Sequence, residues 1–135
     1  MAQDYRELVV WQRAIDLSVL IYRITESFPR HEIYGLSSQM RRAGISIASN
    51  IAEGRGRLNA REFRQFLGMA RGSTCELQTQ LHVAKLLGYD SGHSISEAEA
   101  RSNELSKMLH AFIQKLAAVE NPPPKKRKSG HPAVR

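Results

Sequence analysis

The stretch Ser46-Ile-Ala-Ser-Asn-Ile-Ala-Glu-Gly-Arg-Gly-Arg57 indicates how this chain folds, because it combines the end of a helix with a basic turn. At about 100° per residue, the polar side chains before Gly54 fall on one narrow strip of a helix, opposite an apolar face. Gly54 is predicted to end this helix in the left-handed conformation, which glycine adopts without a Cβ penalty. The strip consists of Gln39, Arg42, Ser46, Ser49, Asn50 and Glu53.

Two interpretations of this stretch are open. In the first, the polar strip is solvated or hydrogen-bonded to neighbouring helices, as is common for the exposed side of a helix. In the second, Arg55 and Arg57 begin an anion-binding surface in the exposed turn. Both interpretations predict a helix that stops near Gly54 and a basic turn after it.

Several motifs on both sides of this stretch occur in a defined order. Together they resemble the four helix bundle family whose proteins are encoded in intervening sequences of 23S ribosomal RNA genes, and the resemblance covers residues 4 to 119. The motifs are Leu8-Val9-Val10-Trp11-Gln12-Arg13-Ala14, Phe28-Pro29, Tyr34-Gly35-Leu36, Gln39-Met40-Arg41-Arg42-Ala43, Ser46 to Gly54, Glu62-Phe63, Phe66-Leu67, Ala70-Arg71-Gly72-Ser73, Glu76-Leu77 and Gln80-Leu81.

This resemblance implies an all-helical protomer of bacterial type, a ring-shaped homopentamer, and a basic surface that meets nucleic acid, with no known enzyme activity. A related branch contains the accessory variability determinant proteins of diversity-generating retroelements, which work beside a reverse transcriptase. The implied partners are therefore a second copy of the chain and a nucleic acid. In the alternative, the chain is a scaffold or accessory factor for a reverse transcriptase or another nucleic-acid-processing enzyme.

The length of 135 residues is enough for one hydrophobic core. Apolar periodicity predicts helices over residues 8–27, 36–53, 60–87 and from the segment 94–99 to residue 119. Short connections predict an all-α, antiparallel up-down-up-down four-helix bundle domain over residues 1–121. Three prolines follow Asn121 and few apolar residues come after them, so residues 122–135 are predicted to be a disordered basic tail.

Capping residues mark three of the predicted helix ends. Asn59, with Glu62 three residues later, predicts the start of the third helix, and Gly88 predicts its end. Ser96 and Glu99 form a capping box that predicts the start of the fourth helix.

The first helix carries more apolar surface than one bundle core can bury. One apolar stripe contains Val10, Leu17, Ile21 and Ile24, and a second contains Leu8, Trp11, Ile15, Val19 and Tyr22. A helix in an isolated bundle needs only one buried face, so another subunit is predicted to cover the second stripe.

The net charge of +7 is distributed unevenly along the chain. Residues 41–71 contain seven arginines and only two acids, Glu53 and Glu62, and residues 122–135 contain five basic residues and no acid. Such segregated positive charge favours a polyanionic partner. The candidate nucleic-acid-binding residues are Arg41, Arg42, Arg55, Arg57, Arg61, Arg64, Arg71, Lys125, Lys126, Arg127 and Lys128.

The sequence contains no recognisable catalytic or metal-binding pattern. The histidines at positions 31, 82, 93, 110 and 131 are scattered, and the lone Cys75 lies in the middle of a predicted helix. No stretch of about 18 apolar residues and no signal peptide is present. We therefore expect a cytoplasmic, non-enzymatic protein without a metal or other cofactor.

Overall fold

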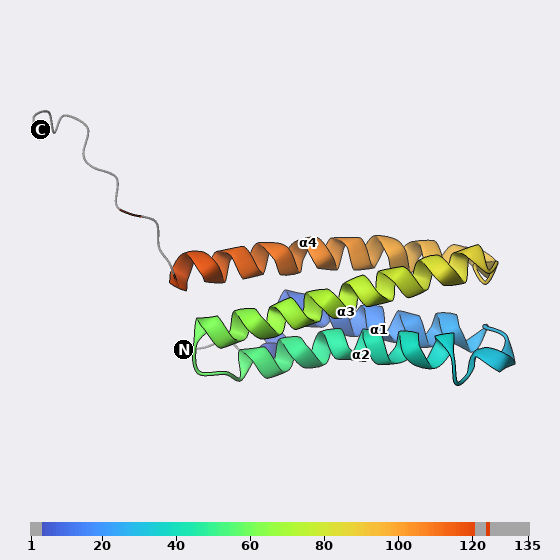
Figure 1. Cartoon of the computed structure of the whole chain (residues 1–135), viewed down its shortest axis with the longest axis horizontal. Helices are drawn as coiled ribbons and strands as arrows, with labels where there is room; N and C mark the ends of the chain where they lie inside the picture. Colours follow the sequence, from blue (N-terminus) through green and yellow to red (C-terminus); the bar gives the residue numbers. More distant parts are fainter. Residues whose placement is uncertain (1–3, 121–123, 125–135) are drawn as a thin grey trace, which may run out of the picture.

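The computed structural model describes residues 4–120 and residue 124, which form four α-helices, three short 3₁₀ helices and no strand (Figure 1). The prediction of an all-α fold with four helices is confirmed. Most of the predicted tail, residues 122–135, lies outside the described residues. The helices are η1 (Tyr5–Glu7), α1 (Val9–Glu26), η2 (Arg30–Glu32), α2 (Leu36–Arg55), α3 (Ala60–Leu86), η3 (Ser91–His93) and α4 (Ser94–Glu120).

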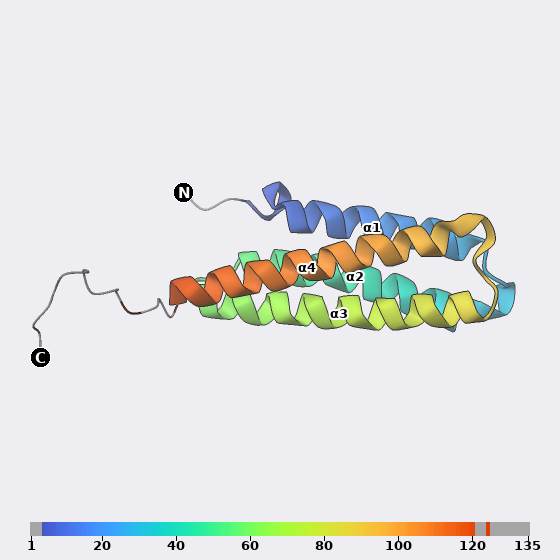
Figure 2. The ribbon, with the colours of Figure 1, turned by 90° about the horizontal axis from the view of Figure 1, so that it is seen from above.

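The four long helices lie alongside one another, and each packs against the next, with α4 also packing against α1 (Figures 1 and 2). The start of α1, the α2–α3 turn and the end of α4 lie toward the same end of the molecule. We call this the basic end, because Arg55, Arg57, Arg61 and Arg64 lie in or beside the α2–α3 turn. The opposite end contains the α1–α2 and α3–α4 connections.

All four long helices contribute apolar side chains to one core. Of the two stripes predicted on α1, the one with Leu17 and Ile21 is buried. In the second stripe, Leu8 is buried and Trp11 and Ile15 are partly buried against the same core. Only Val19 and Tyr22 of that stripe are exposed, at 44% and 40%. The largest fully buried apolar residues are Leu17, Ile21, Met40, Ile47, Ile51, Leu67, Leu77, Leu81, Ile95, Leu105 and Leu109.

The predicted role of Gly54 is wrong. Helix α2 continues to Arg55, Gly54 is a buried residue within it, and the C-cap Gly56 has a φ of −79°. Gly54 is required for space instead, because a Cβ there would lie 2.6 Å from the Phe66 Cβ and 2.9 Å from the Phe63 Cδ1. The left-handed conformation occurs after α3, where Gly88 has a φ of +80°, as predicted for the end of that helix.

One predicted cap is confirmed and the other is wrong. Asn59 caps α3, since its Oδ1 accepts a hydrogen bond from the Glu62 backbone N at 2.9 Å. Helix α4 begins at Ser94, which places Ser96 inside the first turn. Asp90 accepts from the Ile95 backbone N at 2.9 Å and from the Ser96 hydroxyl at 3.2 Å. The connecting segment therefore supplies the acceptor that the capping box was expected to provide.

Within residues 4–120, none of the helices is long and apolar enough to span a membrane.

Candidate nucleic-acid interface

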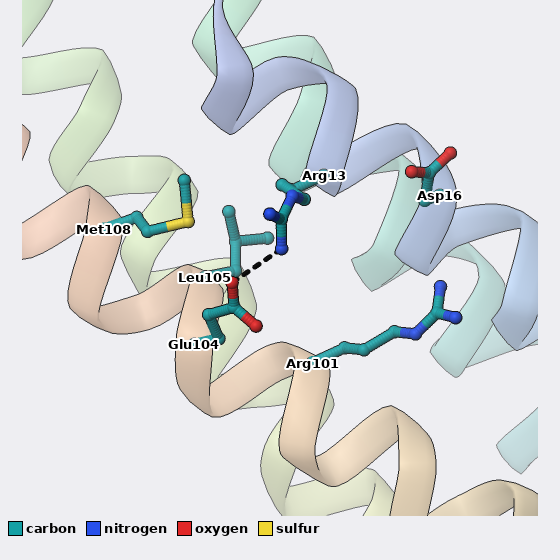
Figure 3. Close-up of a pocket in the computed structure, with 6 residues that line it drawn as sticks. All are labelled: Arg13, Asp16, Arg101, Glu104, Leu105 and Met108. Carbon is teal, nitrogen blue, oxygen red and sulfur yellow. Dashed lines mark hydrogen bonds and ion pairs between the residues drawn. The ribbon is translucent and has the colours of Figure 1, made fainter.

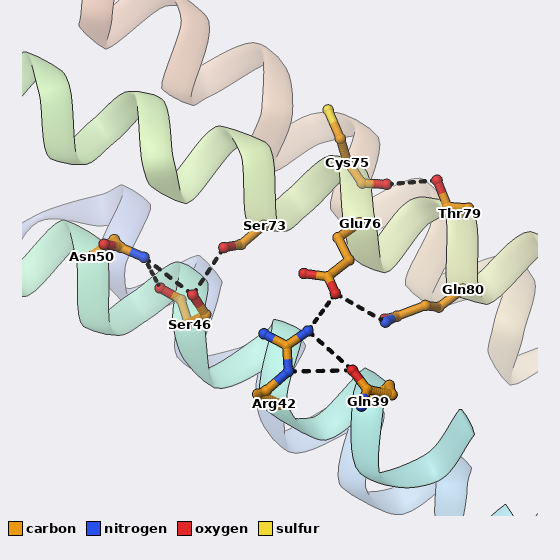
Figure 4. A network of polar contacts seen from close by, with 9 residues as sticks. All are labelled: Gln39, Arg42, Ser46, Asn50, Ser73, Cys75, Glu76, Thr79 and Gln80. Atoms are coloured by element: carbon orange, nitrogen blue, oxygen red, sulfur yellow. Dashed lines mark hydrogen bonds and ion pairs between the residues drawn. The ribbon is translucent and has the colours of Figure 1, made fainter. Parts of the chain in front are cut away.

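Part of the polar strip of α2 faces α3, and Arg42 and Ser46 form hydrogen bonds with it (Figure 4). Ser49 and Glu53 of the strip are exposed. The Arg42 guanidinium pairs with the Glu76 carboxylate and donates a hydrogen bond of 3.1 Å to the Gln39 Oε1. Gln80 donates to the same carboxylate at 3.5 Å. The charge of Arg42 is therefore matched within the protomer.

A second group of hydrogen bonds continues this strip toward the basic end. The hydroxyl oxygens of Ser46 and Ser73 lie 2.9 Å apart, and Asn50 Nδ2 donates to the Ser46 backbone O at 2.9 Å and to its hydroxyl at 3.1 Å. For this part of the strip, the interpretation as a surface hydrogen-bonded to a neighbouring helix is confirmed, because Ser46 and Ser73 connect α2 to α3. We call the set Gln39, Arg42, Ser46, Asn50, Ser73, Glu76 and Gln80 the polar seam.

The exposed side of α3 carries Cys75 and Thr79 beside the polar seam (Figure 4). The Thr79 hydroxyl donates a hydrogen bond of 3.0 Å to the Cys75 backbone O, one turn earlier in the helix. The Cys75 thiol is free and exposed. This arrangement is an ordinary bond of a helical threonine to the preceding turn.

Arg41 extends toward α1, away from the polar seam. Its Nε donates a hydrogen bond of 2.8 Å to the Thr25 hydroxyl, and its guanidinium carbon lies 4.8 Å from the centre of the Tyr22 ring. Arg41 is half-buried. The neighbouring arginines 41 and 42 therefore belong to two different faces of α2.

The arginines of the α2–α3 turn are placed against aromatic side chains. The guanidinium carbon of Arg55 lies 5.9 Å from the centre of the Phe63 ring, and that of Arg57 lies 4.5 Å from the centre of the Phe66 ring. These two rings are the groups that pack against Gly54. The missing Cβ of Gly54 thus allows the contact that brings the rings, and with them the arginines, into position.

The first two turns of α3 extend this positive region. Arg61 is exposed and Arg64 is half-buried, and they lie three residues apart, on one side of the helix. The nearest acid to Arg57 with a measured contact is Glu53, whose Oε2 lies 4.0 Å from the Arg57 Nη2. A solvent-exposed pair at that distance contributes little binding energy. The turn and its flanking helix ends stay net positive because their four arginines outnumber their two acids, Glu53 and Glu62.

A hollow of about 370 Å³ opens at the basic end. We call it the basic-end hollow. Among the described residues that line it, two are arginines and none is acidic. Leu58 lies in the α2–α3 turn and is 98% exposed, and the Phe63 and Phe112 rings meet edge to face with their centres 5.3 Å apart. Its lining residues are Leu8, Arg55, Arg57, Leu58, Asn59, Ala60, Phe63, Phe112 and Leu116.

Sequence reasoning did not find the apolar wall of this hollow. Leu8, Phe112 and Leu116 come from segments far from the α2–α3 turn, and only the packing of the helices brings them together. Leu58 was the one local signal, since it is a large apolar residue within a polar turn. Leu58 lies outside both helices, so the apolar face of neither helix includes it.

The remaining candidate residues lie elsewhere. Arg71 lines a hollow of about 390 Å³ between α3 and α4, together with Lys107 and His110. Lys125, Lys126, Arg127 and Lys128 lie outside the described residues. They follow α4, whose last turn is at the basic end.

A groove of about 310 Å³ runs between α1 and α4 above Leu105 and Met108 (Figure 3). Its charged residues are balanced, since two arginines, Arg13 and Arg101, face two acids. Arg13 Nη1 lies 2.6 Å from Glu104 Oε1. A balanced groove of this kind does not select for an anion in the way that the basic-end hollow does.

Within the part of the chain that the structure describes, no group of three or more His, Cys, Asp or Glu residues could hold a metal ion. His131, one of the five histidines, lies outside that part.

The fold and the charges together define a small all-α protein of four long helices with a basic end. A comparison with known protein families matches residues 6–111 to the family described as 23S rRNA-intervening sequence protein. The match covers more than half of the chain, and the chain belongs to this family. The family resemblance deduced from the motifs is thereby confirmed, whereas the relation to retroelement accessory proteins stays a prediction.

A crystal structure of a protein of unknown function from the S23 ribosomal protein family of Bacteroides thetaiotaomicron is similar to this chain, with 23% identity and a TM-score of 0.70. The similarity covers 78% of this chain and 99% of that chain. At this level of identity, the likeness concerns the fold alone. No match was found among curated proteins.

Proposed function

We propose that this chain is a non-enzymatic nucleic-acid-binding protein of the 23S rRNA intervening sequence type, acting in the cytoplasm and binding RNA or DNA through its basic end. The observation that carries the proposal is the concentration of Arg55, Arg57, Arg61 and Arg64 around one turn. Phosphate groups are the natural partner of such a cluster, because guanidinium groups replace the counterions of the nucleic acid backbone.

The packing supports the basic end over the other candidate arginines. Arg42 is paired with Glu76 in the polar seam, and Arg41 donates to Thr25 and stacks on Tyr22. Arg55 is half-buried and Arg57 is exposed, and both guanidinium groups lie against aromatic rings. A guanidinium that stacks on a ring through its face can still donate to phosphate oxygens through its edge. The basic tail residues 125–128 are tethered to the same end by α4.

Self-association is part of the proposal. The second apolar stripe of α1 leaves Val19 and Tyr22 exposed, and Ile45 on α2 is 45% exposed, one turn from Arg41. We call Trp11, Ile15, Val19, Tyr22 and Ile45 the α1–α2 face. Burial of this face between antiparallel four-helix protomers would give a homo-oligomer, and the family resemblance implies a pentameric ring. The four arginines of each protomer would then repeat around the ring and reinforce one another.

The test replaces Arg55, Arg57, Arg61 and Arg64 together by glutamine and measures the affinity for a short labelled RNA and DNA by fluorescence anisotropy. We expect a large loss of affinity, and a slope of log affinity against log salt that is shallower by about 3 to 4 units between about 50 and 200 mM salt. Helicity and oligomer mass should not change, because none of the four side chains belongs to the buried core.

The matched control replaces Arg23, Arg30, Lys85 and Arg101 by glutamine. These exposed cations lie outside the basic end, and the control removes the same net charge. We expect a much smaller loss of affinity. An equal loss in the two variants would show that net charge, and not the basic end, determines binding. If the unchanged protein bound neither RNA nor DNA at low salt, this result would contradict the proposed function itself.

The second candidate function is a scaffold for a reverse transcriptase or another nucleic-acid-processing enzyme, and the exposed α1–α2 face is the observation that favours it. Val19→Ser and Ile45→Ser change two exposed residues of this face. A fall in oligomer mass measured by light scattering would assign the face to self-association. An unchanged mass, with loss of a protein partner whose capture survives nuclease treatment, would assign it to the scaffold function.

A further inference from the structure

We propose that the basic-end hollow is a binding site for one unpaired nucleotide, with the base against Leu58, Phe112 and Leu116 and the phosphate between Arg55 and Arg57. The inference rests on the proposed function and deepens it, because it names the form of nucleic acid that the site prefers. That form is a single strand, a loop or an unpaired end, of RNA or DNA.

The composition of the hollow carries this inference. Its volume of about 370 Å³ is within the usual range of small-ligand sites, about 300 to 1,000 Å³. Its lining combines two cations with apolar side chains from the turn, from α3 and from α4. A duplex offers phosphates to the cations but keeps its bases stacked inside, so it leaves the apolar wall unused. An unpaired nucleotide supplies both an anion and an apolar, planar base.

The two arginines are held in place before any ligand arrives. Arg55 lies over the Phe63 ring and Arg57 over the Phe66 ring, and both rings pack against the buried Gly54. Less side-chain entropy is therefore lost when a phosphate binds.

Two acids lie beside the hollow, and each already has a partner. Glu53 Oε2 lies 4.0 Å from the Arg57 Nη2. Glu62 accepts a hydrogen bond of 3.3 Å from Asn59 Nδ2, and Asn59 Oδ1 in turn accepts from the Glu62 backbone N. Within the described part of the chain, the lining of the hollow includes Asn59 but no acid. The site thus presents positive charge to an incoming ligand.

Leu58 supplies an apolar surface that the described part of the protomer leaves unburied. It is 98% exposed in the turn between two long helices, although a leucine at such a place stabilises neither helix. A base lying against it would remove apolar surface from water. Leu116, on the final turns of α4, lies on the same hollow and extends this wall.

The basic tail follows α4 in the sequence, and α4 contributes Leu116 to the hollow. Lys125 follows Glu120, the last residue of α4, by five residues, which is a reach of roughly 18 Å for an extended chain. The neighbouring phosphates of a bound strand would lie within this distance. A strand is therefore a better match to this end than a free mononucleotide.

The test uses fluorescence anisotropy to measure the affinity of the full chain for two probes. One is a labelled single-stranded RNA, and the other is the blunt-ended duplex of that strand with its complement. The protein is expected to prefer the single strand. Leu58→Ser should weaken single-strand binding about 5- to 10-fold and duplex binding less than about 2-fold. Leu58→Met should restore the preference. The matched control is Leu86→Ser, because Leu86 is 75% exposed at the opposite end and should change neither affinity.

A competition experiment tests the role of the base directly. Adenosine 5′-monophosphate should displace the single strand at concentrations at which ribose 5-phosphate, which has the phosphate but no base, does not. Displacement by both alike would overturn the assignment of the base to the apolar wall. Displacement by an acidic, leucine-containing peptide but not by the mononucleotide would overturn the proposal in favour of a protein ligand.

The outcomes separate this inference from the proposed function. If Leu58→Ser leaves the preference unchanged while the fourfold arginine variant loses both probes, the nucleotide site is wrong and the basic end still binds nucleic acid. If the unchanged protein binds neither probe at low salt, both fail.

Discussion

The two ends of the bundle use their charged side chains differently. At the opposite end, Glu32 accepts hydrogen bonds from the Leu36 backbone N at 3.2 Å and from the Tyr89 hydroxyl at 3.0 Å. The Lys85 Nζ lies 2.9 Å from the Glu99 Oε1 at this end, and Asp90 caps the start of α4. At the basic end, Arg55 and Arg57 contact aromatic rings.

This difference teaches how one small fold can combine stability with a charged surface. The carboxylates of the opposite end satisfy backbone donors and connect segments far apart in the sequence, so their charges belong to the fold. The arginines of the basic end gain packing against phenyl rings, but no carboxylate is close enough to pair strongly with Arg57. Their charge is thus available to a ligand, as the proposed function requires.

Gly54→Ala should have the largest effect on the difference between the two ends. The new Cβ would meet the Phe66 Cβ at 2.6 Å, and that atom cannot move without the α3 backbone. We expect the free energy of unfolding to fall by about 1 to 3 kcal/mol, as for other overpacked sites, and nucleic acid binding to weaken because Phe63 and Phe66 shift with the arginines above them. Urea unfolding and fluorescence anisotropy measure the two effects.

Gly72→Ala is the matched control for this change. No heavy atom lies within 4 Å of the Cβ that it would add, so the higher helix propensity of alanine should raise stability by up to about 1 kcal/mol. If Gly54→Ala were as stable as the original protein, the close contact between α2 and α3 would not determine the position of the basic turn.

Removing one helix cap at each end should sharpen the comparison. Asp90→Ala removes the acceptor for the Ile95 backbone N and for the Ser96 hydroxyl, and Asn59→Ala removes the acceptor for the Glu62 backbone N. Each should cost about 1 kcal/mol of unfolding free energy, with Asp90→Ala the larger, measured by urea unfolding. Only Asn59→Ala should also weaken nucleic acid binding. An effect of Asp90→Ala on binding would contradict the separation of the two ends.

Deletion of residues 122–135 should have a smaller effect on binding than the fourfold arginine change. The sequence predicts no fixed structure for this segment, so its cations lose conformational entropy when they contact phosphates, whereas Arg55 and Arg57 are already placed. We expect affinity to fall about 2- to 5-fold at moderate salt, measured with the same labelled RNA. If the deletion abolished binding and the arginine change did nothing, the tail would be the binding element.

High pH should weaken the contacts of the opposite end and give the smallest of these effects. Burial raises the pKa of the Tyr89 hydroxyl above its ordinary value of 10.0, and the hydrogen bond to Glu32 raises it further. The hydrogen bond to Glu99 likewise raises the pKa of Lys85 above 10.5. Both groups hold their proton more tightly in the folded state, so their contribution to stability is complete below these ordinary values and declines as the pH rises through the folded-state pKa.

Urea unfolding at neutral pH and above pH 10 checks this dependence. Tyr89→Phe should lower stability at neutral pH, through loss of the bond to Glu32, and should make the decline at high pH shallower. A decline of unchanged steepness in Tyr89→Phe would show that other groups are responsible.

The number and bounds of the helices were predictable because they depend on nearby residues. The observed bounds of α1, α2 and α3, and the end of α4, differ by at most two residues from the predicted bounds. Helix α4 begins within the segment 94–99 that the sequence indicated for its start. The Asn59 cap and the left-handed Gly88 were also predictable, since each acts within one turn of its own helix. The exposed Val19 and Tyr22 lie in the second apolar stripe that the same periodicity indicated on α1.

Contacts between distant segments decided the rest. Gly54 looks like a helix end in the sequence, but the approach of α3 makes it a point of close packing, and Asp90 replaces Ser96 as the cap because the connection folds back onto α4. The sequence placed Arg41 and Arg42 together with Arg55, whereas the fold directs them to α1 and α3. The sequence by itself thus determined the helices and the excess of positive charge. Only the tertiary structure decided which arginines are paired and that Leu8, Phe112 and Leu116 meet the basic turn, because these contacts join residues that are far apart along the chain.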